Sequence, residues 1–287
     1  MNLTSPAQVK AWCQANDFHP NRVLGQNFLI DRNALEAIVD AAELPAEGAR
    51  VLEIGPGLGV LTEELLRRGA TVTAIEKDSA LAARLAGALG NPPALTVVAG
   101  DALDCIKAGQ CDGFPFLVSN LPYQAGTRIL LEMIRRVGSE GGVPRTDGGK
   151  PPNPPEVMVV LVQAEVADRL AAGPGSKTRG LAGVWAQLDY DVKPVRKVAA
   201  SCFWPRPEVG STVVRLVRHH RNDALSAEAR AQFHRLTKQA FEHRRKQLGA
   251  IFRDIPFTAV ASSARAEQLT NADWLALARE TLSLVNS

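Results

Sequence analysis

Several features that mark metalloproteins, secreted proteins and membrane proteins are missing from this sequence. The four cysteines form no C-x-x-C pair and the five histidines show no ligand spacing, so we expect reduced thiols and no metal site. No apolar run reaches the roughly 18–20 residues that a membrane-spanning helix needs. Residues 1–10 contain no apolar core of an export signal. We therefore expect a cytoplasmic protein that does not enter a membrane.

The net charge is small and unevenly distributed. Residues 1–218 carry 23 basic and 23 acidic side chains, whereas residues 219–287 carry ten basic and seven acidic ones and so hold the whole net charge of +3. A basic excess of this size is weak support for a polyanionic partner, because a solvated helix face has a similar composition.

Short apolar runs alternate with helical patterns through the first part of the chain. This alternation predicts an α/β fold with a parallel sheet and crossover helices. Two later strands, near 191–199 and 211–218, follow one another, and we expect them to pair antiparallel at one edge. The other predicted strands are 50–54, 71–75, 95–99, 114–119 and 157–162, and the helices between them are 58–68, 79–89, 124–137 and 164–171.

The pattern changes after residue 218. Up to that point it is interrupted by residues 138–155, ten of which are Gly or Pro, and we expect a mobile loop there. Beyond it, Ser226 and a capping box at 270–273 begin two helical patterns. We predict a large domain at 1–218 and a small all-helical domain at 219–287.

A glycine loop joins the strand at 50–54 to the next helix. Gly55 and Gly57 let the backbone approach a ligand, and Glu76, at the end of the next strand, can accept hydrogen bonds from two ribose hydroxyls. Asp101, after the third strand, can hold an adenine amino group. The G-x-G-x-G spacing, with Val60 where a dinucleotide loop has Gly, favours S-adenosylmethionine (SAM) over NAD. A tight turn without a ligand remains the third alternative.

The tetrapeptide Asn120-Leu121-Pro122-Tyr123 follows the apolar run 114–118. Pro122 donates no backbone hydrogen bond, so it ends the strand in a turn. The Asn120 side-chain carbonyl and a backbone carbonyl can each accept one N–H of an amino group, while Tyr123 can stack on a planar ring. No G-x-S-x-G element points to a hydrolase. The tetrapeptide therefore indicates a site for a nucleobase that carries an exocyclic amine.

Four motifs in this order resemble those of the ribosomal RNA adenine N6,N6-dimethyltransferases of the KsgA type. They are Gly25-Gln26-Asn27-Phe28-Leu29, Glu53-Ile54-Gly55-Pro56-Gly57, Asn120-Leu121-Pro122-Tyr123, and Phe203-Trp204-Pro205-Arg206-Pro207 with Val209 and Ser211. The resemblance covers nearly the whole chain. It departs at Arg179-Gly180-Leu181, where the family often has an Arg after the Gly.

The resemblance implies a Rossmann-like class I SAM-dependent methyltransferase, with a mostly parallel seven-stranded sheet and a small helical domain at the C-terminus. Asn120 and Leu121 would accept the target amine, ahead of Pro122 in the turn, and Tyr123 and Phe203 would pack on the flipped adenine. The residues implied to contact SAM are Gln26, Asn27, Leu29, Gly55, Gly57, Glu76, Asp101, Ala102 and Asn120.

The implied substrate is a pair of adjacent adenines near the 3′ end of 16S rRNA, in the small ribosomal subunit or its precursor, and the implied enzyme is a monomer. Basic residues would hold RNA phosphates without reading sequence. We expect one group beside the pocket wall and a second on a helix of the small domain. These residues are Lys193, Arg196, Lys197 and Arg206, then Arg244, Arg245 and Lys246.

Two other functions remain open. One is dimethylation of adenine in 23S rRNA, which the small basic excess and the helical tail make less favoured. The other is a ribosome-assembly factor that binds RNA without catalysis, against which the intact Gly55, Glu76, Asp101 and Asn120 argue. A DNA adenine methyltransferase has a similar catalytic tetrapeptide of the N-P-P-Y type, but that tetrapeptide usually differs from this one at the second position.

Overall fold

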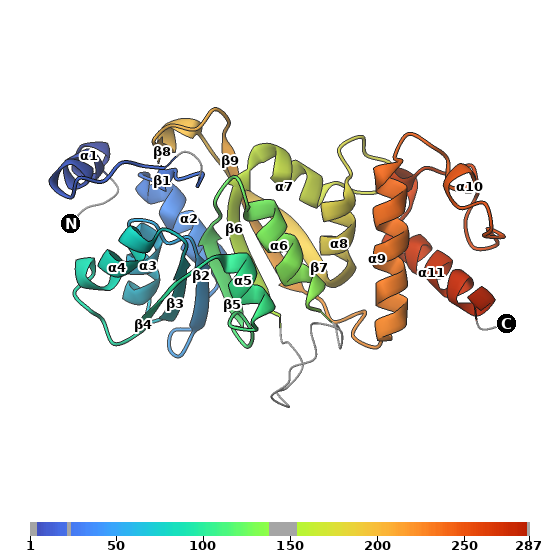
Figure 1. The fold of residues 1–287 in the computed structure, drawn as a ribbon, viewed down its shortest axis with the longest axis horizontal. Coiled ribbons are helices and arrows are strands. Elements are labelled where there is room, and N and C mark those ends of the chain that lie inside the picture. The colour runs from blue at the N-terminus through green and yellow to red at the C-terminus, as the bar shows by residue number, and fades with distance from the viewer. Residues whose placement is uncertain (1–4, 22–23, 138–153, 286–287) are drawn as a thin grey trace.

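A seven-stranded sheet forms the centre of the molecule (Figure 1). The computed structural model describes residues 5–21, 24–137 and 154–285. The strand order is β4-β3-β2-β5-β6-β9-β7, and β2 to β6 are parallel. Strand β9 pairs antiparallel with both β6 and β7, which confirms the predicted antiparallel pair and places β7 at the edge. The bounds are β2 Arg50–Ile54, β3 Thr71–Glu76, β4 Leu95–Ala99, β5 Phe116–Asn120, β6 Val157–Gln163, β7 Tyr190–Val198 and β9 Ser211–Arg218.

Helices cover both faces of the sheet, which explains why its central strands are apolar without alternation. In β6, Met158 and Val160 face one apolar cluster while Val159 and Leu161 face another, because successive side chains point to opposite faces. One cluster includes helices α2 Arg32–Ala42, α3 Val60–Arg67 and α4 Ser79–Ala88. The other includes α5 Ala102–Lys107, α6 Gly126–Arg135, α7 Ala164–Ala171 and α8 Leu181–Asp189.

A second, two-stranded sheet was not predicted. Strand β1, Phe28–Leu29, lies before the first strand that the sequence predicts and pairs antiparallel with β8, Phe203–Trp204. It joins the first and the last of the four motifs, which are far apart in sequence. Helix α1, Pro6–Ala15, precedes it, and a short 3-10 turn, Ala200–Cys202, leads into β8.

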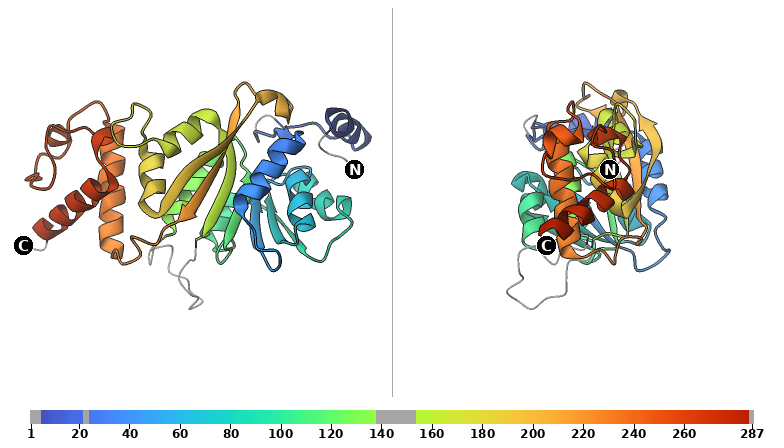
Figure 2. Two further views of the ribbon diagram at one scale, coloured as in Figure 1. Left: turned by 180° about the vertical axis from the view of Figure 1, so that it is seen from behind. Right: turned by 90° about the vertical axis from the view of Figure 1, so that its right-hand side faces the viewer.

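Three helices follow the sheet and lie beyond its β7 end (Figures 1 and 2). They are α9 Ala227–Glu242, α10 Leu248–Ile251 and α11 Asn271–Val285, with a 3-10 turn at Ala266–Gln268. Ser226 caps α9 through the Ala229 N–H, as its sequence position predicts. The apolar cluster under α6 and α8 continues into Phe233 and Trp274, so the division at residue 218 stays a prediction.

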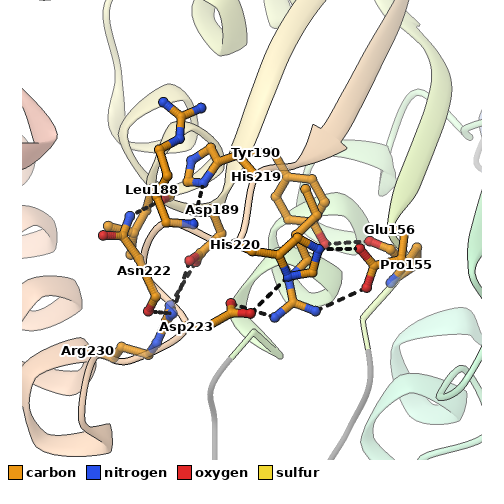
Figure 3. A network of polar contacts seen from close by, with 12 residues as sticks. Pro155, Glu156, Leu188, Asp189, Tyr190, His219, His220, Asn222, Asp223 and Arg230 are labelled. Carbon is orange, nitrogen blue, oxygen red and sulfur yellow. Dashed lines mark hydrogen bonds and ion pairs between the residues drawn. The ribbon is translucent and has the colours of Figure 1, made fainter.

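A polar network joins the sheet to α9 (Figure 3). Arg230 of α9 donates hydrogen bonds of 2.8 and 3.0 Å to the two oxygens of Asp189 at the end of α8, and both side chains are buried. Nearby, the two ring nitrogens of His220 lie 2.8 Å from Glu156 and 2.9 Å from Asp223.

The predicted loop at 138–155 lies outside the described residues, except for Pro154 and Pro155, which are buried.

Two expectations from the sequence concern a membrane-spanning helix and a metal site. Over the described residues, no helix is long and apolar enough to cross a membrane. The same residues contain no cluster of three or more His, Cys, Asp or Glu side chains arranged to hold a metal ion.

Candidate active site

A cavity lies at the carboxyl ends of β2, β3 and β5, which is where open α/β sheets bind ligands. The structure brings to it all nine residues predicted to contact the cofactor and all four of the tetrapeptide. The segment that precedes β1 forms part of its wall. These predicted residues are Gln26, Asn27, Leu29, Gly55, Gly57, Glu76, Asp101, Ala102, Asn120, Leu121, Pro122 and Tyr123.

The glycine loop has the left-handed backbone that glycine favours. Gly57 has φ +58°, and a Cβ there would lie 3.0 Å from the Phe28 ring of β1. Gly59 has φ +86°, and a Cβ there would lie 2.6 Å from Leu85 of α4. The third glycine therefore serves helix packing, whereas Gly55 and Gly57 line the cavity. This division accounts for the G-x-G-x-G spacing.

Glu76 ends β3 with its carboxylate fixed by two backbone donors. Its oxygens accept hydrogen bonds from the Gly57 N–H at 3.0 Å and the Asp78 N–H at 2.9 Å. Burial raises the pKa of Glu76, while these two hydrogen bonds oppose the rise. A carboxylate oxygen can accept more than one hydrogen bond, so Glu76 remains suited to a ribose diol.

Asp101 has partners that the sequence did not predict. One oxygen caps α5 through the Leu103 N–H at 2.8 Å, and the other lies 2.8 Å from Lys77 Nζ. The bond from Lys77 is the main cause that lowers the pKa of Asp101. Lys77 also lines the cavity. An adenine amino group at Asp101 would therefore share this carboxylate with a lysine.

The segment before β1 is tied to both sides of the cavity. Gln26 Nε2 donates to Asp78 Oδ2 at 2.9 Å, at the start of α4. The Asn27 carbonyl accepts from Asn120 Nδ2 at 3.2 Å, at the end of β5. Residues 24–29 thus link the predicted cofactor side to the tetrapeptide.

The Asn120 amide has one end paired and the other unpaired. Because Nδ2 donates to the Asn27 carbonyl, Oδ1 is directed away from that carbonyl. Oδ1 is buried and has no hydrogen-bond partner among the residues the structure describes. A buried acceptor without a donor costs about 1–3 kcal/mol. An N–H donor from a ligand in the cavity would remove this cost.

The turn after Asn120 is held tightly against the next helix. The Leu121 N–H donates to Leu161 of β6 at 3.2 Å, and the Pro122 carbonyl accepts from the Gly126 N–H at 2.7 Å. A Cβ at Gly126 would lie 2.9 Å from Leu121 Cβ. The start of α6 therefore fixes the position of Leu121, which is buried.

Of the two predicted aromatic contacts, the structure brings Tyr123 but not Phe203 to the cavity wall. Phe203 is 2% exposed and pairs with Leu29 between β8 and β1. The two rings meet edge to face, with centroids 6.2 Å apart. Phe203 therefore packs against Tyr123 from outside the cavity lining, and its direct contact with a base stays a prediction.

Glu53 is a cavity residue whose role the sequence did not reveal. It is 1% exposed, and Oε2 accepts a hydrogen bond from Thr62 Oγ1 at 2.7 Å. Burial raises the pKa of Glu53 to about 8, and the charge of Glu76 adds to the rise. Glu53 stands in the glycine-loop motif, but only its depth in the fold distinguishes it from a solvated strand residue.

The predicted phosphate-binding residues lie outside the cavity lining. Exposed Arg196 and Lys197 of β7 pair with Val213 and Thr212, near the start of β9. The helical placement of residues 244–246 was wrong, because α9 ends at Glu242 and they form a turn before α10. Arg244 also donates to the Lys177 carbonyl at 2.6 Å, so its guanidinium already has a partner. The remaining predicted phosphate contacts, Lys193, Arg206, Arg245 and Lys246, are exposed.

Comparison of this chain with known proteins agrees with this geometry. A family model described as ribosomal RNA adenine dimethylase matches residues 17–282. Two relatives are named Ribosomal RNA small subunit methyltransferase A. The one from Deinococcus radiodurans is 45% identical over 214 residues, which are 75% of this chain and 67% of that protein. The one from Leifsonia xyli is 37% identical over an alignment of 294 positions, which covers 97% of this chain and 98% of that protein.

Two solved structures share the architecture. A dimethyladenosine transferase from Plasmodium falciparum has a TM-score of 0.71 at 23% identity, covering 89% of this chain and 98% of that one. The 23S rRNA methyltransferase ErmE has a TM-score of 0.63 at 25% identity, covering 88% and 99%. Both neighbours confirm the predicted Rossmann-like class I methyltransferase fold. The chain belongs to the ribosomal RNA adenine dimethylase family.

Proposed function

We propose that this protein transfers methyl groups from SAM to the N6 amines of two adjacent adenines near the 3′ end of 16S rRNA, in the small ribosomal subunit or its precursor. The observation that carries the proposal is the buried, unpaired Oδ1 of Asn120 beside the cavity. Family membership and the names of the relatives support the adenine and the small-subunit RNA. We expect the protein to act as a monomer in the cytoplasm.

The residues around the cavity offer the chemical groups that would hold the ribose and the adenine of SAM. Glu76 offers a carboxylate for the ribose hydroxyls, and Asp101 offers one for the adenine amine. Gly55 and Gly57 allow close approach of the backbone. SAM, when bound, supplies a methyl group on a positively charged sulfur, which needs no further activation.

The tetrapeptide prepares the attacking nitrogen. The lone pair of an adenine N6 amine is delocalised into the ring, so the amine is a poor nucleophile. Asn120 Oδ1 and the Leu121 carbonyl each accept one N–H, which favours a pyramidal nitrogen and directs its lone pair. Tyr123 stacks on the base once it has left its helix. The residues act by positioning and local electrostatics.

Dimethylation makes a further demand on the same two acceptors. In the first transfer the nitrogen gains a methyl group and releases one proton, so a single N–H and a lone pair remain. We propose that Asn120 and Leu121 leave space for the monomethylated amine to rotate, so that its remaining hydrogen is held and its lone pair is directed again. Accumulation of monomethyladenine alone at long reaction times would contradict this.

The direct test uses purified protein, SAM and three RNA substrates. These are small-subunit precursor particles, free 16S rRNA and 23S rRNA, and the products are read by nucleoside mass spectrometry. We expect N6,N6-dimethyladenine in the small-subunit samples and none in 23S rRNA. Methylation of 23S rRNA would support the alternative substrate. Binding to the particle without methylation would support an assembly factor without catalytic activity.

We also propose that Arg245 and Lys246 hold phosphates, together with the exposed basic residues of β7. Alanine at both positions should weaken RNA binding and reduce the slope of log affinity against log salt concentration by about 1–2. SAM affinity should not change. Alanine at Lys10 and Lys107, two exposed lysines, is the charge-matched control. Equal losses in both double variants would remove the case for this surface.

A further inference from the structure

The phenol of Tyr123 is anchored by a single side chain. Its hydroxyl lies 2.5 Å from Ser211 Oγ, and this is its one hydrogen bond among the residues the structure describes. Ser211 is 2% exposed, so water does not compete freely for the contact. Tyr123 is one of the residues that line the cavity, whereas its hydrogen-bond partner Ser211 is not. Ser211 therefore influences the cavity wall without lining the cavity.

Ser211 is itself held firmly from both sides. It is the first residue of β9 and pairs with Gln163 of β6 and with Val198 of β7. The Phe203 ring also packs edge to face with the Tyr123 ring, at a centroid distance of 6.2 Å. A tyrosine side chain has two main torsions, and fixing its tip restricts both of them. The ring is thereby a preformed stacking surface.

On the basis of the proposed function, we infer that Ser211 is a positioning residue for the acceptor base. Its hydroxyl holds the Tyr123 ring at the angle at which a stacked adenine presents N6 to Asn120. Methyl transfer depends on the approach of the two reacting atoms, and small misplacements are costly. The anchor thus assigns a specific role to the last residue of the fourth motif, which the resemblance left without one.

The anchor can be observed without any reaction, because the chain has only two tyrosines. Protein labelled with 3-fluorotyrosine should give two fluorine NMR resonances, and Tyr123→Phe identifies one of them by its loss. We expect Ser211→Ala to shift and narrow the Tyr123 resonance. The resonance of buried Tyr190, whose hydroxyl donates to the Pro155 carbonyl at 2.9 Å, is the internal control. An unchanged Tyr123 resonance would show that no anchor exists.

A double-mutant cycle tests the catalytic consequence. One hydrogen bond of ordinary strength corresponds to about a fivefold change in rate. We expect Ser211→Ala, Tyr123→Phe and the double variant each to lower kcat/KM for RNA by about five- to tenfold, with no further loss in the double variant. Ser211→Thr should rescue activity, because threonine keeps the hydroxyl. The Kd of SAM should stay within twofold of wild type throughout.

The outcomes separate the possible failures. Additive losses, or a wild-type rate in Ser211→Ala, would overturn the positioning role. If Ser211→Ala does not fold, Tyr123→Phe removes the same hydrogen bond from the other side and decides alone. If wild-type protein transfers no methyl group to adenine, the proposed function fails, while the fluorine resonances still report whether Ser211 restrains Tyr123.

Discussion

The network at α9 and the cavity at the tetrapeptide both contain buried charged or polar side chains. These side chains are paired with one another at α9, whereas key groups at the cavity have no such partner. At α9, Asp189 lies against Arg230, and both terminal guanidinium nitrogens bond to its carboxylate (Figure 3). At the cavity, Glu53 has no cationic partner among the described residues, and Asn120 Oδ1 has no donor. The first region uses polar groups to join elements, and the second keeps polar capacity for a ligand.

The two regions differ in whether a buried polar group has a partner within the protein, and this difference separates structural from functional residues. A buried carboxylate whose two oxygens are paired within the protein, as those of Asp189 are with Arg230, stabilises the fold, and removing its partner leaves an uncompensated charge. An unpaired buried group destabilises the protein, and a ligand can remove that cost where the group lies beside a cavity, as Asn120 Oδ1 does. Substitutions at the network should therefore change stability, whereas substitutions at the cavity should change catalysis and lower stability little.

The largest effect on stability is expected from Arg230→Leu. This change leaves the Asp189 carboxylate buried without its partner, which costs about 3–5 kcal/mol of unfolding free energy. Denaturant unfolding measures it. The double change Arg230→Leu with Asp189→Leu should recover most of the loss, because it removes both charges. A double variant as unstable as the single one would show that packing, and not the charge, governs this junction.

Asn120→Ala should have the opposite profile. Loss of one directed acceptor in a closed site lowers kcat by about 10²- to 10³-fold at saturating SAM, by analogy with the loss of an oxyanion-hole donor. The unfolding free energy should change by less than about 1 kcal/mol or rise, because an unsatisfied buried oxygen is removed. Methylation rates and thermal unfolding of the same preparation check both parts. A large stability loss would place Asn120 with the structural group.

Glu53 should make stability depend on pH. Its pKa is raised to about 8 in the folded state from an ordinary 4.5, so the folded protein binds this proton more tightly than the unfolded chain. Its contribution is therefore complete below about pH 4.5 and falls by about 1.4 kcal/mol per pH unit up to about pH 8. Glu53→Gln removes this loss, so its advantage over wild type should grow with pH across that window.

Unfolding of SAM-free protein from pH 5 to 9 gives the difference curve for Glu53. The exposed Glu47→Gln variant controls for the loss of one carboxylate. A curve for Glu53→Gln that is no steeper than the Glu47→Gln curve would mean that the Glu53 carboxylate is solvated or has a partner in the folded protein.

The sequence predicts the sheet well because each central strand is encoded locally. In β6 an apolar run buried on both faces can be recognised without knowledge of its neighbours. The caps at Ser226 and Thr270 are equally local, and both make capping hydrogen bonds at the predicted positions. Glu76, Asp101 and Asn120 were predictable because each ends a strand or follows one. Gln26 and Asn27 precede the first strand, and only the resemblance to the family pointed to them.

The failures have a common physical cause, which is dependence on distant contacts. Strands β1 and β8 have two residues each, and their pairing joins Leu29 to Phe203 across most of the chain. Residues 244–246 have helix-forming side chains, yet the chain turns there, and the Leu248 N–H just beyond the turn bonds to the distant Ala264 carbonyl. The Lys77–Asp101 pair and the depth of Glu53 likewise exist only in the folded sheet.

The smallest effect is expected from a substitution at the edge of the cavity, where packing rather than charge determines the position of the tetrapeptide. Gly126→Ala places a methyl group 2.9 Å from Leu121 Cβ, and overpacking of this kind costs about 1–3 kcal/mol. Because Leu121 follows Asn120 directly, the shift should also lower kcat. Gly87→Ala in α4 is the matched control, since no atom lies within 4 Å of its added methyl, and it should stabilise the helix by up to about 1 kcal/mol. Thermal unfolding and methylation rates of the two variants should therefore diverge in both measurements, and a Gly126→Ala protein with wild-type kcat would show that the tetrapeptide tolerates movement of Leu121.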